Sequence, residues 1–129
     1  MLSEKHIKIQ TLMREFTQKY VAPIAAEIDE NHRFPEETVR ALVQHGMMAI
    51  PYPKTFGGAG ADTLAYIIAV EELSKACATT GVILSAHTSL GISPIYTYGS
   101  DALKAKYLPD MMSGKKLGAF GLTEPNAGT

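Results

Sequence analysis

The stretch from Ala76 to Gly99, ACATTGVILSAHTSLGISPIYTYG, contains no Asp, Glu, Lys or Arg. A helix on the surface of a soluble protein has a charged or polar face, so a helix without one has to be covered by protein or by a ligand. We therefore expect residues 81–98 to form a covered helix. The Ser, Thr, His and Pro residues of the stretch make it too polar for the core of a bilayer, which argues against a membrane span.

The chain before this stretch has helical spacing. Its apolar residues from Ile9 to Tyr20 recur at steps of three and four, which predicts one buried face of a helix over residues 4–20. Pro23 has no amide hydrogen and disfavours helical geometry in the residue before it, so we expect the helix to break there. A second helical piece is expected over residues 24–30.

Two further helices have recognisable starts or ends. Phe34-Pro35-Glu36-Glu37 is typical of a helix start, because proline suits the first turn and acidic side chains interact favourably with the helix dipole. Gly46 is suited to end that helix, since glycine readily adopts the left-handed conformation of a C-terminal cap. Asp62 is suited to cap a helix over residues 63–78, which is apolar on most sides and is expected to lie centrally.

The last part of the chain changes character. Ser100 is expected to cap a helix over residues 101–107, which Pro109 breaks before one further turn that ends at Gly114. Residues 117–122 are predicted to form a short strand. The predicted fold class is therefore all-α, an up-and-down or orthogonal bundle of about five or six helices that ends in one strand. A strand cannot satisfy its backbone alone, so we expect its partner strands to lie in a following domain.

Composition and charge exclude several classes of function. With a net charge of −1 at pH 7, the chain lacks the basic character of nucleic-acid-binding proteins, so no nucleic-acid partner is expected. The single cysteine, Cys77, excludes an internal disulfide. The four histidines are scattered without the spacing of metal ligands, so no metal site is expected.

The last twelve residues, GAFGLTEPNAGT from Gly118 to Thr129, form a loop after the expected strand. The Thr123 hydroxyl can reach a planar heterocycle that lies over the strand end, and Ala127 and Gly128 let backbone amides approach an anion closely. Thr129 adds another donor. These features suit a ligand with a flat polar ring and a phosphate. A plain turn that uses Pro, Asn and Gly for their backbone torsions accounts for them equally well.

This loop resembles the flavin-binding segment of the acyl-CoA dehydrogenase family, in which an Asp usually follows the position of Thr129. Other segments resemble the family in the same order along the chain: PEETVRALVQHGMMAI, FGGAGAD, AVEELSKACATTGVILSAHTSLGISPI and YGSDALKAKYLPDMMSGKKLGAFGLTEP. The closest resemblance is to the short-chain, butyryl-CoA type. It implies that residues 1–115 form the family's N-terminal helical domain and that residues 116–129 begin its middle β-domain.

The resemblance also implies roles for individual residues. The residues expected to contact FAD are Phe120, Leu122, Thr123 and Thr129. Thr129 is also expected to lie near the bound thioester of the substrate. Val82, Ala86 and Leu90 recur every four residues on one helix face, and in the family this helix passes beneath the acyl-chain pocket. Their spacing alone is explained equally well by an ordinary protein core.

The family reaction is an α,β-dehydrogenation. A carboxylate removes the α-proton of an acyl-CoA, the β-hydride passes to FAD, and the electrons leave through electron-transfer flavoprotein. The family's base is a Glu in a C-terminal helical domain, so none of the 13 acidic residues here is assigned a catalytic role. We therefore expect this chain to be an N-terminal piece of the enzyme that is inactive alone.

The resemblance implies three partners: an acyl-CoA substrate, electron-transfer flavoprotein and further copies of the same chain, since the family is tetrameric. The expected compartment is the bacterial cytoplasm, or the mitochondrial matrix for a processed eukaryotic protein. The alternative function is a non-catalytic helical module whose uncharged face docks another protein. Such a module has no use for a strand and a Thr-Glu-Pro-Asn-Ala-Gly-Thr loop after its last helix, which favours the enzyme.

Overall fold

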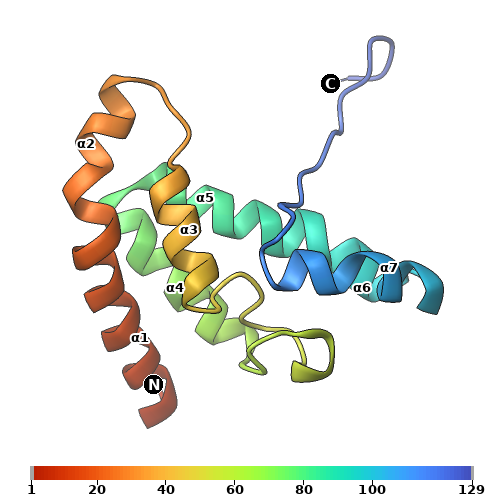
Figure 1. Ribbon diagram of the computed structural model, residues 1–129, viewed down its shortest axis with the longest axis horizontal. Coiled ribbons are helices and arrows are strands. Elements are labelled where there is room, and N and C mark those ends of the chain that lie inside the picture. The colour runs from red at the N-terminus through yellow and green to blue at the C-terminus, as the bar shows by residue number, and fades with distance from the viewer. Residues whose placement is uncertain (1, 129) are drawn as a thin grey trace.

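Five continuous helices, together with the one-turn helix η2 (Lys54–Phe56), make up the computed structural model, which describes residues 2–128 (Figure 1). The first helix consists of α1 (Glu4–Phe16), the π-helical turn η1 (Thr17–Val21) and α2 (Ala22–Glu30). The other four are α3 (Glu36–Gln44), α4 (Thr63–Ala76), the run of α5 (Ala78–Ser85), η3 (Ala86–Ile92) and α6 (Ser93–Tyr98), and α7 (Asp101–Met112). The expected all-α fold and number of helices are confirmed.

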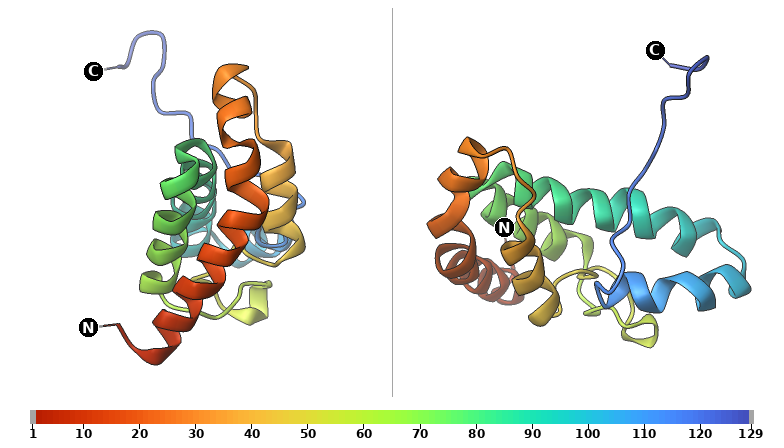
Figure 2. Two further views of the ribbon diagram at one scale, coloured as in Figure 1. Left: turned by 90° about the vertical axis from the view of Figure 1, so that its left-hand side faces the viewer. Right: turned by 45° about the horizontal axis from the view of Figure 1, so that its top comes forward.

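The helix α4 lies at the centre of the bundle. It packs against α1 on one side and α5 on the other, and α3 packs against η1. At the other end of the molecule α7 packs against α6 and η3. Figures 1 and 2 show the last residues, in dark blue, running away from the helices as an extended tail. The central position expected for the helix that follows Asp62 is confirmed.

Two apolar clusters fill the interior. The larger lies among α1, η1, α3, α4 and α5, and its fully buried members include Met13, Leu42, Met48, Leu73 and Leu84. The smaller lies under α7 and consists of Ala49, Tyr52, Ile92, Leu108, Met111 and Met112. The flexible methionine side chains in both clusters suit the irregular gaps between helices that cross at different angles.

Local signals set several helix ends as the sequence predicts. The Asp62 carboxylate accepts a hydrogen bond of 2.8 Å from the amide of Ala65 at the start of α4. The Ser100 hydroxyl accepts one of 3.3 Å from the amide of Leu103 at the start of α7. Beyond the end of α3, Gly46 has a φ of 66°, the left-handed conformation that glycine adopts without strain.

The break expected at Pro23 does not occur. The helix continues from α1 into α2 through η1, where the Ala22 amide donates to the carbonyl of Thr17, five residues earlier. This π-helical step changes the hydrogen-bond register just before the proline, which then occupies the first turn of α2. Proline is tolerated in a first turn because its missing amide hydrogen has no partner to lose there.

Two expectations for the end of the chain are also wrong. Pro109 lies inside α7, which runs without a break to Met112. Its ring faces solvent, so the helix carbonyl left without a donor can bond water. Residues 117–122 are extended but form no strand, because no other segment among residues 2–128 pairs with them.

The glycines Gly46 and Gly114 allow strain and crowding to be measured separately. Both have positive φ angles, 66° and 78°. A Cβ on Gly46 would meet nothing within 4 Å, whereas one on Gly114 would lie 2.5 Å from Val43 Cγ2 and 2.9 Å from Met48 Cγ. We expect Gly46→Ala to lower the free energy of unfolding by about 1 kcal/mol. We expect Gly114→Ala to lower it by about 1–3 kcal/mol more, because the core is overpacked as well.

Urea unfolding of the two variants beside the wild type tests this prediction. Equal losses of unfolding free energy in the two variants would contradict the crowding around Gly114.

Candidate functional site

The tail leaves the bundle at Gly118 and is exposed beyond it. Every described residue from Ala119 to Gly128 is exposed to solvent. Phe120 and Leu122, two of the residues expected to contact FAD, have exposed fractions of 54% and 76%. Large apolar side chains with this exposure, in a segment that packs on no helix, form a surface that another part of a protein or a ligand can cover.

A tight turn closes the tail. The Glu124 amide donates to the carbonyl of Ala127 at 2.9 Å, and the Ala127 amide donates back to the carbonyl of Glu124 at 3.1 Å. Pro125 and Asn126 stand at the corner, which agrees with their turn-forming torsions. Thr123 precedes this turn and is exposed, and Thr129 lies outside the described residues. The turn explains the Pro and Asn of the motif without a ligand, and it leaves the Thr123 hydroxyl at the surface.

The root of the tail is held by the buried side chain of His87. Its Nε2 lies 2.9 Å from the carbonyl oxygen of Met111, in the last turn of α7, and its Nδ1 lies 2.9 Å from the amide nitrogen of Gly118. A carbonyl only accepts and an amide only donates, so Nε2 carries the proton and Nδ1 accepts. The ring is therefore neutral, and it joins η3, α7 and the tail.

Two glycines bring the tail against the helix at the same point. A Cβ on Gly91 would lie 2.7 Å from the Cα of Gly118, and a Cβ on Gly118 would lie 2.8 Å from the Cα of Gly91. The Met111 side chain packs at the same point, since its Cε would lie 2.6 Å from a Cβ on Gly118. Only residues without a side chain allow the two backbones to approach this closely. The tail therefore starts at a tightly packed joint.

The residues expected to face the acyl chain lie on the outer surface of the same helix. Val82 and Leu90 have exposed fractions of 63% and 47%, and Ala86 is half-buried. His87 and Thr88 lie between them in sequence and are buried. The helix therefore presents an apolar face to the outside. The tail starts beside this helix, but its outer part extends away from the bundle (Figures 1 and 2).

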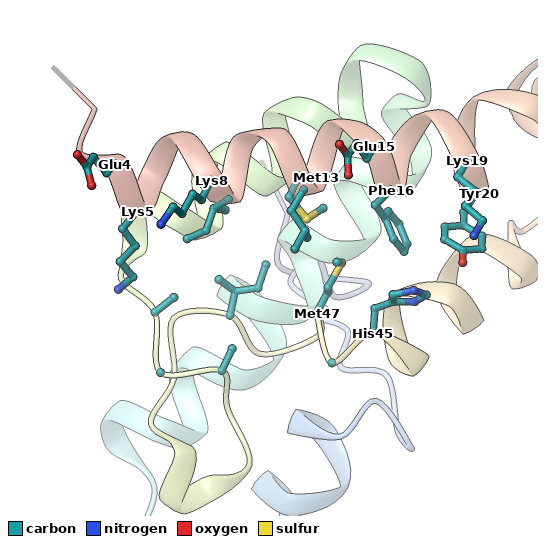
Figure 3. A pocket seen from close by; sticks show the side chains of 17 residues that line it. Glu4, Lys5, Lys8, Met13, Glu15, Phe16, Lys19, Tyr20, His45 and Met47 are labelled. Carbon is teal, nitrogen blue, oxygen red and sulfur yellow. The ribbon is translucent and has the colours of Figure 1, made fainter.

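A groove of about 870 Å³ lies elsewhere, between α1 and residues 45–61. Figure 3 shows side chains of α1 on one wall, with Met47 and His45 opposite. Its floor includes Met13 and Phe16, and three lysines stand along it, two from α1 and Lys19 from η1. None of the residues expected to contact FAD or the acyl chain lines this groove. This groove is thus separate from the candidate site.

Two kinds of site are not found in the described part of the chain. Among residues 2–128, no three His, Cys, Asp or Glu side chains lie close enough together to hold a metal ion. No helix there combines the length and the apolar character that crossing a bilayer requires.

Sequence reasoning missed the joint at His87. The histidine itself stands out as the one histidine of the uncharged stretch, but its two partners, Met111 and Gly118, are 24 and 31 residues away. No local pattern links such distant positions.

Comparison with known proteins identifies the fold. The family model of the acyl-CoA dehydrogenase N-terminal domain matches residues 3–115. The short-chain specific acyl-CoA dehydrogenase of Clostridium acetobutylicum is 58% identical over 128 residues, which cover 99% of this chain and 34% of that protein. Butyryl-CoA dehydrogenase of Megasphaera elsdenii superposes with a TM-score of 0.91 at 39% identity, over 99% of this chain and 34% of the other.

A chain in the structure of the electron transferring flavoprotein of Acidaminococcus fermentans superposes with a TM-score of 0.93 at 43% identity. That match covers 100% of this chain and 34% of the other. The chain thus spans about a third of the length of the proteins it matches.

The outer apolar face of α5 and η3 should make the isolated chain bind a hydrophobic dye and associate with itself. We expect the double variant Val82→Ser, Leu90→Ser to bind roughly half as much dye and to elute later from a sizing column. Ile7→Ser is the matched control, because Ile7 is exposed to a similar degree, 51%, on α1. An equal loss of dye binding in the control would contradict the prediction that the outer face of α5 and η3 is the main dye-binding surface.

The neutral state of His87 predicts a pH dependence of stability. Burial lowers the pKa of His87 from its ordinary value of 6.5, because the charged ring would lose its water. The unfolded chain then takes up a proton that the folded chain refuses, so the free energy of unfolding should fall as the pH drops below about 6.5. Urea unfolding at several pH values measures this slope. His87→Gln should have a shallower slope, and an unchanged slope would contradict the prediction.

Proposed function

This chain belongs to the acyl-CoA dehydrogenase family, and we propose that the whole protein removes the α and β hydrogens of a short-chain acyl-CoA with FAD as electron acceptor. The observation that carries this proposal is the 58% identity, over 99% of the chain, to a short-chain specific acyl-CoA dehydrogenase. In this proposal residues 1–115 are the N-terminal helical domain and residues 116–129 begin the middle β-domain.

The tail has donors that fit a flavin. The Thr123 hydroxyl is exposed, and within the described chain the amides of residues 119–123 have no acceptor. These groups can bond the polar edge of a flat heterocycle, while Phe120 and Leu122 cover its apolar part. FAD, when bound, supplies the acceptor for the hydride from the β-carbon of the substrate. Thr129 is proposed to contact both FAD and the thioester.

The outer face of α5 and η3 is proposed to line the acyl-chain pocket. Val82, Ala86 and Leu90 carry no polar groups, and the two larger side chains are exposed in this chain. An apolar wall excludes water from the reacting carbons of the substrate. That exclusion strengthens the electrostatic stabilisation of the charge that develops when the weakly acidic α-proton is removed.

The base that removes the α-proton is proposed to lie outside residues 1–129. Such a base needs a pKa near the working pH, which a carboxylate reaches when it is buried without a cation. Glu72 is the buried carboxylate of the described chain, but its oxygens lie 3.1 Å from Arg14 Nη2 and 2.8 Å from Lys75 Nζ. The hydrogen bond from Arg14 lowers the pKa of Glu72, the opposite of what a base requires.

The partners follow from the family. We propose that acyl-CoA is the substrate, that electron-transfer flavoprotein takes up the electrons, and that the protein is a homo-oligomer, a tetramer as in the family. The match to a chain in a structure of the electron transferring flavoprotein of Acidaminococcus fermentans supports the second partner. The proposed compartment is the bacterial cytoplasm or, in a eukaryote, the mitochondrial matrix.

A titration of the full-length protein with FAD, followed by butyryl-CoA, tests the proposed function. We expect the flavin absorbance to bleach on addition of the thioester, and Thr123→Val to weaken FAD binding about tenfold through the loss of one hydrogen bond to a polar ring. Thr97→Val is the matched control, because Thr97 is also an exposed threonine but lies on α6.

A full-length protein that ignores both FAD and butyryl-CoA would contradict the proposal. The helical interaction module would then be the better account of this chain.

A further inference from the structure

Neither hydrogen bond of His87 is made to a residue proposed to bind FAD or substrate, yet both of its ring nitrogens are used. We propose that His87 is a positioning residue, which sets the place and the direction in which the cofactor-facing tail leaves the helical domain. This inference rests on the proposed function for what the tail contacts. The joint itself is a feature of the described chain.

The path of the chain from α7 to the tail is fixed step by step up to Gly118. Gly114 turns the chain with a φ of 78°, and the amide of Lys116 donates to the carbonyl of Asp110 at 3.0 Å. The amide of Gly118 then donates to His87 Nδ1. Among residues 2–128, this is the last hydrogen bond between the tail and the bundle, since the next ones lie within the turn at Glu124.

His87 can do this because it is itself held in place. Its Nε2 donates to the Met111 carbonyl at the end of α7, which also accepts a hydrogen bond of 3.0 Å from the Gly114 amide. The ring is 1% exposed, and it lies in the π-helical segment η3. Single π-helical turns within helices often mark functional positions. One ring thus ties the end of α7 and the start of the tail to the same helix.

The close approach of Gly91 and Gly118 is a second, independent constraint on the same joint. The two backbones touch without side chains between them, so the tail cannot shift along the helix without a clash. The hydrogen bond fixes the rotation at Gly118, and the glycine contact fixes its distance from the helix.

A small error at this joint becomes large at the cofactor. Thr123 lies five residue steps beyond Gly118 along the extended tail, a span of about 16 Å. A rotation of about 10° at Gly118 would therefore move the Thr123 hydroxyl by roughly 3 Å. A misplacement of about 1 Å in a reacting group is enough to lower a rate about a hundredfold.

The first arm of the test uses this chain alone and measures amide hydrogen exchange by NMR. We expect His87→Leu, which removes both hydrogen bonds, to speed the exchange of the Gly118 amide about tenfold relative to core amides such as that of Leu42. His87→Gln keeps one donor and one acceptor and should restore most of the protection. Tyr66→Phe is the matched control, since it removes a hydrogen bond to the Ser85 carbonyl on the same helix without touching the tail.

The second arm uses the full-length protein with FAD. We expect His87→Leu to raise the Kd for FAD at least about tenfold and to shift the flavin absorption bands, with His87→Gln close to the wild type. Gly91→Ala should give a similar shift by displacing the tail without removing a hydrogen bond. The control Tyr66→Phe should leave the bands unchanged.

The outcomes separate the two proposals. If the wild type binds FAD and His87→Leu binds it equally well with the same spectrum, the positioning role is overturned and the proposed function stands. If the wild type binds no FAD, the proposed function fails, and the exchange rate of Gly118 still decides whether His87 anchors the tail. Unchanged exchange in His87→Leu would overturn the anchor itself.

Discussion

The fold depends on a helix that has no charge of its own. From Ala78 to Tyr98 the helix made of α5, η3 and α6 contains no Asp, Glu, Lys or Arg, so hydrogen bonds rather than ion pairs join it to its neighbours. Tyr52 donates to the carbonyl of Thr88 at 2.7 Å, and Tyr66 donates to the carbonyl of Ser85 at 3.3 Å. His87 bonds the end of α7. These bonds place the loop before η2, the helix α4 and the helix α7 around the uncharged helix.

The cost of an unpaired buried polar group explains why these partners matter. A hydrogen bond between buried groups contributes about 1 kcal/mol, but a buried group that loses its partner costs about 1–3 kcal/mol. The surroundings of the Tyr52 hydroxyl are poorly hydrated, because burial raises the pKa of Tyr52 by disfavouring its charged form. Losing one partner of a bond to the uncharged helix therefore costs more than forming the bond contributes.

The sequence predicts the parts of this fold that depend on neighbours along the chain. The caps at Asp62 and Ser100 and the helix end at Gly46 need only a few adjacent residues, and all three are confirmed. The rules for proline are also local, and they predict helix breaks at Pro23 and Pro109 that do not occur. A π-helical step accommodates Pro23, and exposure to solvent accommodates Pro109. A strand after Lys116 needs a second strand, and no local rule supplies one.

In the candidate site, too, the features that depend on neighbouring residues can be predicted from the sequence, and those that depend on distant residues cannot. The turn residues after Thr123 can be recognised in the sequence, and so can the four-residue spacing from Val82 to Leu90. The joint at His87 cannot, because it brings together residues from three segments. Its consequence is a helix with two kinds of face. The inner face bonds α7 and the root of the tail, and the outer face is left apolar and exposed. Under the proposed function, the inner face would hold the cofactor-facing tail and the outer face would line the acyl-chain pocket, so one helix would set the positions of both ligands.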